Sequence, residues 1–241
     1  MFHYQGKCLL IPSKPDIERD AVAKAWEDNG GTVQRVDRFW ETPELEGRTA
    51  VLYGNHIFCL ILAQKLNLEL VSPPDDFLCY LPEKWLKRAI SRSTIQDASR
   101  FEYPCFIKPM VPKIFSGKVY HSHQELLEEC RQLADNTPVI HSEIIKIHAE
   151  VRAFILGNKI VSASIYEGYA DVQEAITFVD HFLAENVDPA PCTYVLDVGL
   201  LDNGEWVVIE TNAVWGAGLN RCDACAAACC ISEATRPRVY E

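Results

Sequence analysis

The chain has 241 residues, of which 48% are hydrophobic and 24% charged, the composition of a globular protein with its own core. Its net charge of −11 at pH 7 repels nucleic acid and anionic membranes. The longest apolar run, IFCLILA at 57–63, is too short to span a bilayer. We therefore expect neither a nucleic-acid nor a membrane partner, and an anionic ligand needs a local pocket of basic side chains and N–H groups.

Ten cysteines lie inside apolar segments or crowd near the C-terminus. A chain of this size does not need disulfides, and the N-terminus shows no signal-peptide pattern. These features predict reduced thiols and a cytoplasmic protein. The segment CDACAAACC at 222–230 has no second cysteine or histidine pair at zinc-finger spacing, so we expect a helix there.

The first part of the chain alternates strand and helix patterns. We predict strands at 8–11, 32–36, 49–54 and 68–71 and helices at 15–31 and 56–67. This order predicts a small, mostly parallel sheet with flanking helices. The segment SPPDD at 72–76 then interrupts the pattern and marks a boundary.

The rest of the chain has more antiparallel signals. Here we predict a basic helix at 82–92, a strand ending at 109, a strand at 119–121, a helix at 124–135, a strand at 139–145, a hairpin at 149–166 that turns at Gly157-Asn158, a helix at 171–186, a hairpin at 195–212 and a helix at 222–235. The expected fold is an α/β lobe (1–76) followed by two α+β lobes (77–138 and 139–241).

The hairpin at 195–212 carries acids in an otherwise apolar stretch. Asn203-Gly204 suits a two-residue type I′ turn, and counting back from that turn places Asp197 directly opposite Glu210. Asn212 lies on the same face, which by this count also holds Gly199, Leu201, Trp206 and Val208, and the other face is the predicted core.

Opposed carboxylates repel unless a cation joins them or one is protonated. Two carboxylates and an amide suit Mg²⁺ or Mn²⁺ rather than zinc. An exposed sheet face with solvated acids is an equal alternative.

Basic residues upstream could bind phosphate. Lys108 ends the strand FIKP, and the loop beyond it adds Lys113, Ser116, Gly117 and Lys118. This is a short anion-binding loop that lacks the Walker A spacing. An ordinary strand-end lysine is the alternative for Lys108.

Glu150 and Arg152 lie two residues apart, on one face of their predicted strand. The carboxylate could accept ribose hydroxyls, and the guanidinium could bind a phosphate or a carboxylate. The alternative is a surface ion pair that contributes little.

The series FIKP…SGK, SEII…AEVRAFILGNKIV and VLDVGLLDNGEWVVIETNAVWGAGL resembles the ATP-grasp superfamily. The resemblance covers most of the chain from about residue 80 onward and is strongest for small stand-alone ATP-grasp domain proteins. It implies that ATP lies between the two α+β lobes.

The resemblance also implies roles for individual residues. It implies that Lys108 binds the α- and β-phosphates, and that the hinge Glu143, Ile144 and Ile145 meets adenine. It further implies that Glu150 binds ribose, that Lys84 contacts the nucleotide, that Arg152 lies near phosphate or substrate, and that Asp197, Glu210 and Asn212 bind the metal.

The implied activity is ATP- and Mg²⁺-dependent ligation of a carboxylate to an amine through an acylphosphate. The substrate would be an amino acid, a peptide or a small metabolite. Arg221 and Asp223, after the glycine-rich loop, could face this substrate, although an aspartate near a helix start also serves as a cap.

One departure from the family pattern keeps other functions open. Many members place an arginine near the transferred phosphate, but no Lys or Arg occurs between 160 and 220. A catalytically weak nucleotide-binding regulator and an ATP-dependent phosphotransferase therefore remain alternatives. A homodimer is also left open.

Overall fold

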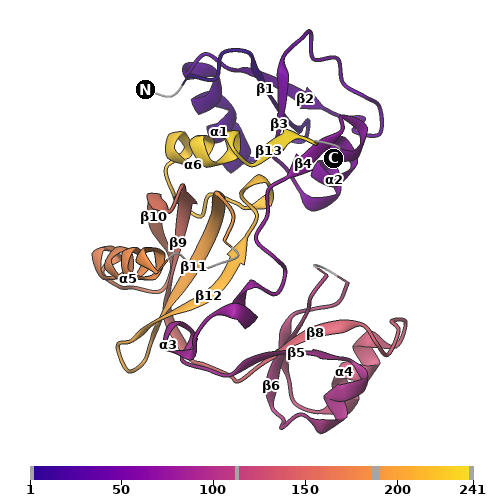
Figure 1. Cartoon of the computed structure of the whole chain (residues 1–241), viewed down its shortest axis with the longest axis vertical. Helices are drawn as coiled ribbons and strands as arrows, with labels where there is room; N and C mark the ends of the chain where they lie inside the picture. The colour runs from indigo at the N-terminus through magenta and orange to yellow at the C-terminus, as the bar shows by residue number, and fades with distance from the viewer. Residues whose placement is uncertain (1–2, 112–113, 186–189, 239–241) are drawn as a thin grey trace.

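The computed structural model describes residues 3–111, 114–185 and 190–238. The molecule is elongated, with an α/β lobe at one end, an antiparallel sheet in the middle and a smaller α+β lobe at the other end (Figure 1). Four sheets order the strands β2-β1-β3, β10-β9-β11-β12, β13-β4 and β5-β8-β6-β7.

The first lobe is a parallel sheet with helices beside it, as the sequence predicts. β1 (Lys7–Pro12) lies between β2 (Thr32–Val36) and β3 (Thr49–Leu52). Two helices, α1 (Ile17–Asp28) and α2 (His56–Lys65), begin at side-chain caps. Asp16 and Asn55 supply these caps, because each side-chain oxygen accepts a backbone N–H of the first turn.

The C-terminal segment returns to this first lobe. β13 (Thr235–Pro237) pairs with β4 (Leu68–Leu70), and α6 (Ala224–Ser232) lies beside α1 (Figure 1). One hydrophobic core joins α6 to the first lobe and also takes in Phe154 and Val195 from the middle sheet. The two ends of the chain therefore build one lobe, which is anchored to the middle sheet.

The middle sheet is antiparallel and carries the acidic hairpin. Its strands are β9 (Ile147–Leu156), β10 (Lys159–Glu167), β11 (Thr193–Leu201) and β12 (Trp206–Asn212). α5 (Val172–Ala184) covers one face with residues at helical spacing, Ala175, Val179, Phe182 and Leu183. The turn between β9 and β10 is the predicted Gly157-Asn158 pair, and both residues have positive φ.

The third lobe holds the strand that ends in Lys108. Its elements are η1 (Phe77–Tyr80), α3 (Glu83–Leu86), β5 (Ile90–Thr94), η2 (Gln96–Arg100), β6 (Cys105–Pro109), β7 (Lys118–Tyr120), α4 (His123–Cys130) and β8 (Pro138–Ser142). A separate core lies between this sheet and α4. The short helix η3 (Val214–Gly216) follows β12.

The prediction of one basic helix at 82–92 was wrong. Helix α3 ends at Leu86 because Lys87 adopts a left-handed φ of +50°. The following residues form β5, which pairs with β8 across the sheet. Buried Arg88 occupies the junction instead of an exposed basic face.

The turn between β11 and β12 also differs from the prediction. Leu201 N donates to Glu205 O at 2.9 Å, so the turn has three residues and not two. Gly204, with φ of +84°, supplies the left-handed position that such a turn needs. This turn shifts the strand pairing by one residue, so that Leu200 opposes Trp206.

A bulge between Asp197 and Val198 then shifts the pairing back. Asp197 therefore does face Glu210, as predicted, although the turn was wrong. The predicted face of Trp206 and Val208 was wrong as well, because both pack into the core that contains Val198.

None of the described helices is long and apolar enough to cross a membrane. All ten cysteines lie within the described residues as free thiols.

Candidate active site

Two cavities meet at Lys108 and Glu210, which line both of them. The smaller, which we call the hinge cavity, has a volume of about 170 Å³ and lies between the third lobe and the middle sheet. The larger, which we call the cleft, has a volume of about 900 Å³ and is bordered by all three lobes. A ligand could therefore extend from one cavity into the other past these two side chains.

The hinge cavity is mostly apolar. Its wall contains the predicted hinge, Glu143, Ile144 and Ile145, together with Leu78, Ile90, Phe106, Val119, Ile140, Ile147 and Ile209. Glu143 is held in place because its Oε2 accepts the N–H of Ala89 at 2.9 Å. A flat apolar group with hydrogen-bonding edges, such as a nucleotide base, fits walls of this kind.

Arg88 closes the polar side of the hinge cavity. Its guanidinium donates to Ser142 Oγ at 3.2 Å and to the carbonyls of Val208 and Ile209 at 3.0 and 3.2 Å. Burial lowers the pKa of Arg88 to about 10. The side chain therefore joins the hinge strand to the bulged strand pair that carries Glu210.

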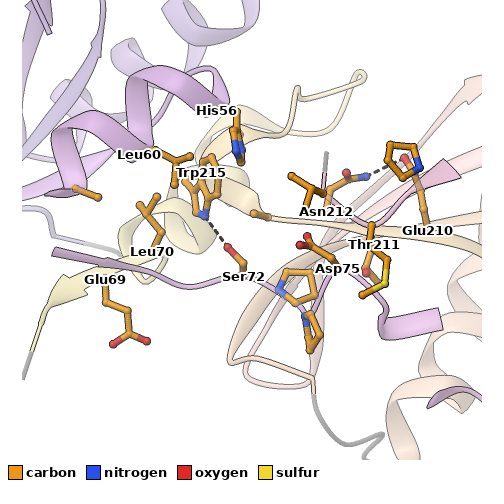
Figure 2. A pocket seen from close by; sticks show the side chains of 18 of the residues that line it. His56, Leu60, Glu69, Leu70, Ser72, Asp75, Glu210, Thr211, Asn212 and Trp215 are labelled. Carbon is orange, nitrogen blue, oxygen red and sulfur yellow. Dashed lines mark hydrogen bonds between the residues drawn. The ribbon is translucent and has the colours of Figure 1, made fainter. Parts of the chain in front are cut away.

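The cleft has a wall from each lobe, and Figure 2 shows part of it. β12 and the following loop contribute Glu210, Thr211, Asn212 and Trp215. The first lobe contributes His56 and Leu60 from α2, Glu69 and Leu70 from β4, and the segment with Ser72 and Asp75. The indole Nε1 of Trp215 donates to Ser72 Oγ at 3.0 Å, which fixes one wall against the other.

Gly117 lies against Lys108 at the edge of the cleft. A Cβ at Gly117 would lie 2.9 Å from the Cβ of Lys108, so a larger residue would displace the lysine. The loop after β6 therefore packs directly on the stem of the lysine that borders both cavities. This contact joins two of the residues predicted for phosphate binding.

Lys118 points away from both cavities. It pairs across the strands with Ile107, so by strand alternation it lies on the α4 side of the sheet. Its ammonium binds Glu125 and Glu129 at 3.0 and 3.2 Å. Ser116 is also tied to Glu129, because its N–H donates to Oε1 at 2.9 Å. Lys113 lies outside the described residues.

Arg152 and Asp197 form a buried ion pair behind the cleft. Arg152 Nε and Nη2 donate to the two oxygens of Asp197 at 2.8 and 2.6 Å, and Nη1 donates to Gly218 O at 2.9 Å. Asp197 is fully buried, and this burial raises its pKa to about 6 despite the opposing effect of Arg152.

Asn212 connects this pair to Glu210. Its Nδ2 donates to Asp197 Oδ2 at 3.3 Å and to Glu210 Oε1 at 2.9 Å. The three predicted metal ligands are therefore neighbours in one hydrogen-bonded network. Because Asn212 uses its nitrogen in these bonds, its amide oxygen is left for another partner.

This set of oxygen donors fits Mg²⁺. Glu210 and Asn212 border the cleft, and Asp197 lies behind them. Among the residues that the structure describes, no cluster of three His, Cys, Asp or Glu could hold a metal. Two carboxylates and an amide are consistent with that finding.

The other predicted residues lie apart from the two cavities. Glu150 accepts a hydrogen bond from the hydroxyl of Tyr166, and Lys84 forms an ion pair with Glu185. Asp223 caps α6 by accepting the N–H of Ala226 at 2.8 Å. Arg221 is exposed beside it and has a positive φ.

The sequence prediction missed the residues that the first lobe contributes to the cleft, such as His56 and Asp75. It also placed Arg88 on an exposed face. The proline pair before Asp75 is a signal for a fixed segment, but nothing in the local pattern shows what that segment faces. Only the approach of the lobes brings these residues to Glu210.

Comparison with solved structures shows the same fold. A RimK domain ATP-grasp protein from Sphaerobacter thermophilus DSM 20745 superposes with a TM-score of 0.62 at 14% identity, covering 94% of this chain and 99% of that one. The ATP-grasp ligase PsnB, complexed with a minimal precursor, gives 0.56 at 13% identity, covering 95% and 99%. D-cycloserine synthetase DcsG gives 0.56 at 12% identity, covering 94% and 99%.

A comparison with curated proteins gave no match. A family model described as an ATP-grasp domain, the second family of its clade, matches residues 85–229. That span contains the hinge, the strand of Lys108 and the acidic hairpin. The chain belongs to this family of ATP-grasp domains.

Proposed function

We propose that this chain is an ATP-dependent ligase that joins a carboxylate to an amine. The observation that carries the proposal is that Lys108 and Glu210 line both cavities. A nucleotide with its base in the hinge cavity would bring its phosphates past these two side chains to the cleft. A carboxylate in the cleft would then meet the terminal phosphate.

The residues of the chain mainly bind and orient the reactants. The hinge at Ile144 and Ile145 binds adenine, Glu150 binds the ribose, and Lys108 neutralises phosphate charge. Glu210, Asn212 and Asp197 hold Mg²⁺, which supplies further positive charge to the phosphate oxygens when it is bound.

The reaction has two steps. The substrate carboxylate attacks the terminal phosphorus of ATP, which gives an acylphosphate and ADP. The amine then attacks the acyl carbon, and phosphate leaves. Because the protein contributes charge and position, no side-chain nucleophile is needed.

Arg152 cannot serve both Asp197 and a phosphate in the arrangement seen, because all three guanidinium nitrogens already donate hydrogen bonds within the protein. We infer that it holds Asp197 and that Lys108 and the metal supply the charge at the transferred phosphate. The absence of lysine and arginine between 160 and 220 agrees with this inference.

The substrate class follows from the cleft and from the relatives. A volume of about 900 Å³ lies in the upper part of the range for ligand sites and has room for a peptide or a small metabolite beside the phosphates. One relative was solved with a peptide precursor and another is a synthetase of the small molecule D-cycloserine. We propose a cytoplasmic enzyme that acts on substrates of these classes.

The test is ADP release with ATP and Mg²⁺ against pooled amino acids and dipeptides. We expect ADP that depends on a particular carboxylate and amine pair, and a loss of at least about 100-fold in Glu210→Ala, comparable to removing one preorganised electrostatic donor. Glu205→Ala is the matched control, since Glu205 is exposed on the same hairpin and pairs with Lys87. It should keep the wild-type rate.

The other outcomes separate the alternatives. ADP release that needs no amine, with a phosphorylated product, would indicate a phosphotransferase. ATP binding by calorimetry without ADP release from any pool would indicate a nucleotide-binding module. If ATP does not bind at all, the proposed function is wrong.

A further inference from the structure

One carboxylate in the cleft has no partner in the network described so far. Asp75 follows the proline pair 73–74 in the segment that joins β4 to the third lobe. It lines the cleft together with Glu210 and Asn212, but it comes from a different lobe (Figure 2). The prolines restrict the backbone of this segment, so the position of the carboxylate is set before any ligand binds.

The neighbouring acids are paired, and Asp75 is not. Asp76 binds Arg92 at 2.6 Å, and Glu69 in the same wall binds Arg236 at 2.7 Å. Asp75 has no hydrogen bond or ion pair with any residue in the described ranges 3–111, 114–185 and 190–238. A carboxylate in a partly desolvated wall without a partner is unfavourable unless a ligand supplies the missing positive charge or donor.

The surroundings of Asp75 indicate the chemistry of that ligand. Desolvation and the charge of Asp76 raise the pKa of Asp75, while His56 and Lys108 lower it. A phosphate or carboxylate beside Asp75 would be repelled, because like charges disfavour each other at close range. An ammonium group would be attracted. The ring of Trp215, fixed by Ser72, and the side chains of Leu60 and Leu70 offer apolar walls for the rest of such a ligand.

We propose that Asp75 binds the ammonium group of the amine substrate and accepts its proton. This inference rests on the proposed ligase function. The ammonium transfers one proton to the Asp75 carboxylate, and the nitrogen lone pair then forms the C–N bond with the acyl carbon. The C–O bond to phosphate breaks, phosphate leaves with the electron pair, and the second nitrogen proton goes with it. Asp75 is exposed to the open cleft and returns its proton to water.

The division of the cleft supports this role. Lys108 and Glu210 lie where the phosphates enter, while Asp75 approaches from the wall of the first lobe. The acyl carbon would lie between them, so the amine would attack from the side opposite the nucleotide. A base in this position acts only in the second step of the reaction.

The experiment separates the two steps with hydroxylamine, which is uncharged at neutral pH and needs no base. Wild type and Asp75→Asn are compared with ATP, Mg²⁺ and pooled amino acids and dipeptides, with hydroxylamine as the trap. We expect Asp75→Asn to form hydroxamate within about twofold of wild type, while ligation to the natural amine from the pool falls at least about 100-fold, the usual contribution of a positioned general base. Asp28→Asn, an exposed aspartate paired with Lys24, is the control and should match wild type in both assays.

Several results would overturn the proposal. Equal loss of both products in Asp75→Asn would place Asp75 in phosphoryl transfer or in folding, and no loss of either would give it no role. If wild type forms neither hydroxamate nor ADP from any pool, the proposed ligase function fails instead.

In that case Asp75 is judged by ammonium binding alone. Alaninamide, which has an ammonium group and no carboxylate, should shift the indole N–H resonance of Trp215 in wild type and not in Asp75→Asn. Equal shifts in the two proteins, or none in wild type, would overturn the ammonium site.

Discussion

The two cavities that share Lys108 and Glu210 are built in different ways. The hinge cavity is small and lined mainly by aliphatic residues at regular strand positions of the third lobe and the middle sheet. The cleft is larger and more polar, and it is completed by residues from the first lobe and by Arg238 near the C-terminus. The difference indicates that the nucleotide side is fixed within strand pairs, whereas the substrate side depends on how the lobes approach each other.

The largest effect is expected behind both cavities, at the pair of Arg152 and Asp197. Arg152→Met leaves a fully buried carboxylate without its partner, which should lower the free energy of unfolding by about 3–5 kcal/mol. Urea unfolding at pH 7.5 measures this loss. Arg236→Met, which removes an exposed pair with Glu69, should cost no more than about 1 kcal/mol.

The double variant Arg152→Met with Asp197→Leu sharpens this prediction. An apolar pair of similar volume should recover most of the stability, because the cost of an unpaired buried charge is gone. ADP release should stay lost, since Asp197 no longer supports Asn212 and Glu210. Recovery of activity together with stability would show that the pair serves only the fold.

A second prediction exchanges the roles of the two cavities. Val119→Trp places an indole in the hinge cavity and should raise the KM for ATP at least about tenfold, equivalent to about 1.4 kcal/mol, with little change for the other substrates. Leu60→Trp fills the wall of the cleft and should do the reverse. Steady-state kinetics with each substrate varied in turn decides the matter, and equal effects of both variants on ATP would contradict the division.

The sequence predicted the nucleotide side better than the substrate side for a physical reason. The pairing of Asp197 with Glu210 follows from strand alternation and a hairpin, which are local. Even there, a three-residue turn and a bulge changed the register in between, and Trp206 and Val208 moved to the other face. Nothing in the turn sequence distinguishes these two routes to the same pairing.

The misplaced residues depend on contacts between distant segments. Arg88 is buried because it joins β8 to β12, and Asp75 reaches the cleft because the first lobe closes over it. Lys118 was predicted for phosphate binding from its loop, but its register opposite Ile107 turns it toward α4. Such orientations need the sheet order, which the sequence pattern does not contain.

A third prediction concerns the link between the first lobe and the buried pair. The carboxylate of Glu18 on α1 accepts the N–H groups of Leu219 and Asn220 at 2.9 and 2.8 Å, next to the carbonyl of Gly218 that binds Arg152. Glu18→Gln should cost about 1 kcal/mol in urea unfolding, because one of two charge-assisted bonds is lost. Glu27→Gln on the exposed side of the same helix should change stability by less than about 0.5 kcal/mol.

The smallest expected effect tests the loop that packs on Lys108. Hydrogen bonds from Ser116, and then from Lys118, lower the pKa of Glu129 to about 2. Because this pKa lies below the ordinary glutamate value of 4.5, the ionised form stabilises the folded state. This contribution is complete above pH 4.5 and is lost as the pH falls toward 2.

Glu129→Gln should therefore be less stable than wild type at pH 7, and the difference should shrink between pH 4.5 and pH 2. Urea unfolding across this range measures it, with Glu128→Gln as the control because Glu128 is an exposed neighbour that contacts only Gln124 among the described hydrogen bonds. If the loop positions Lys108 through Gly117, the same variant should also raise the KM for ATP without changing that for the cleft substrates. A pH-independent difference would show that Glu129 acts by packing, and the loop would then be held by contacts other than its charge.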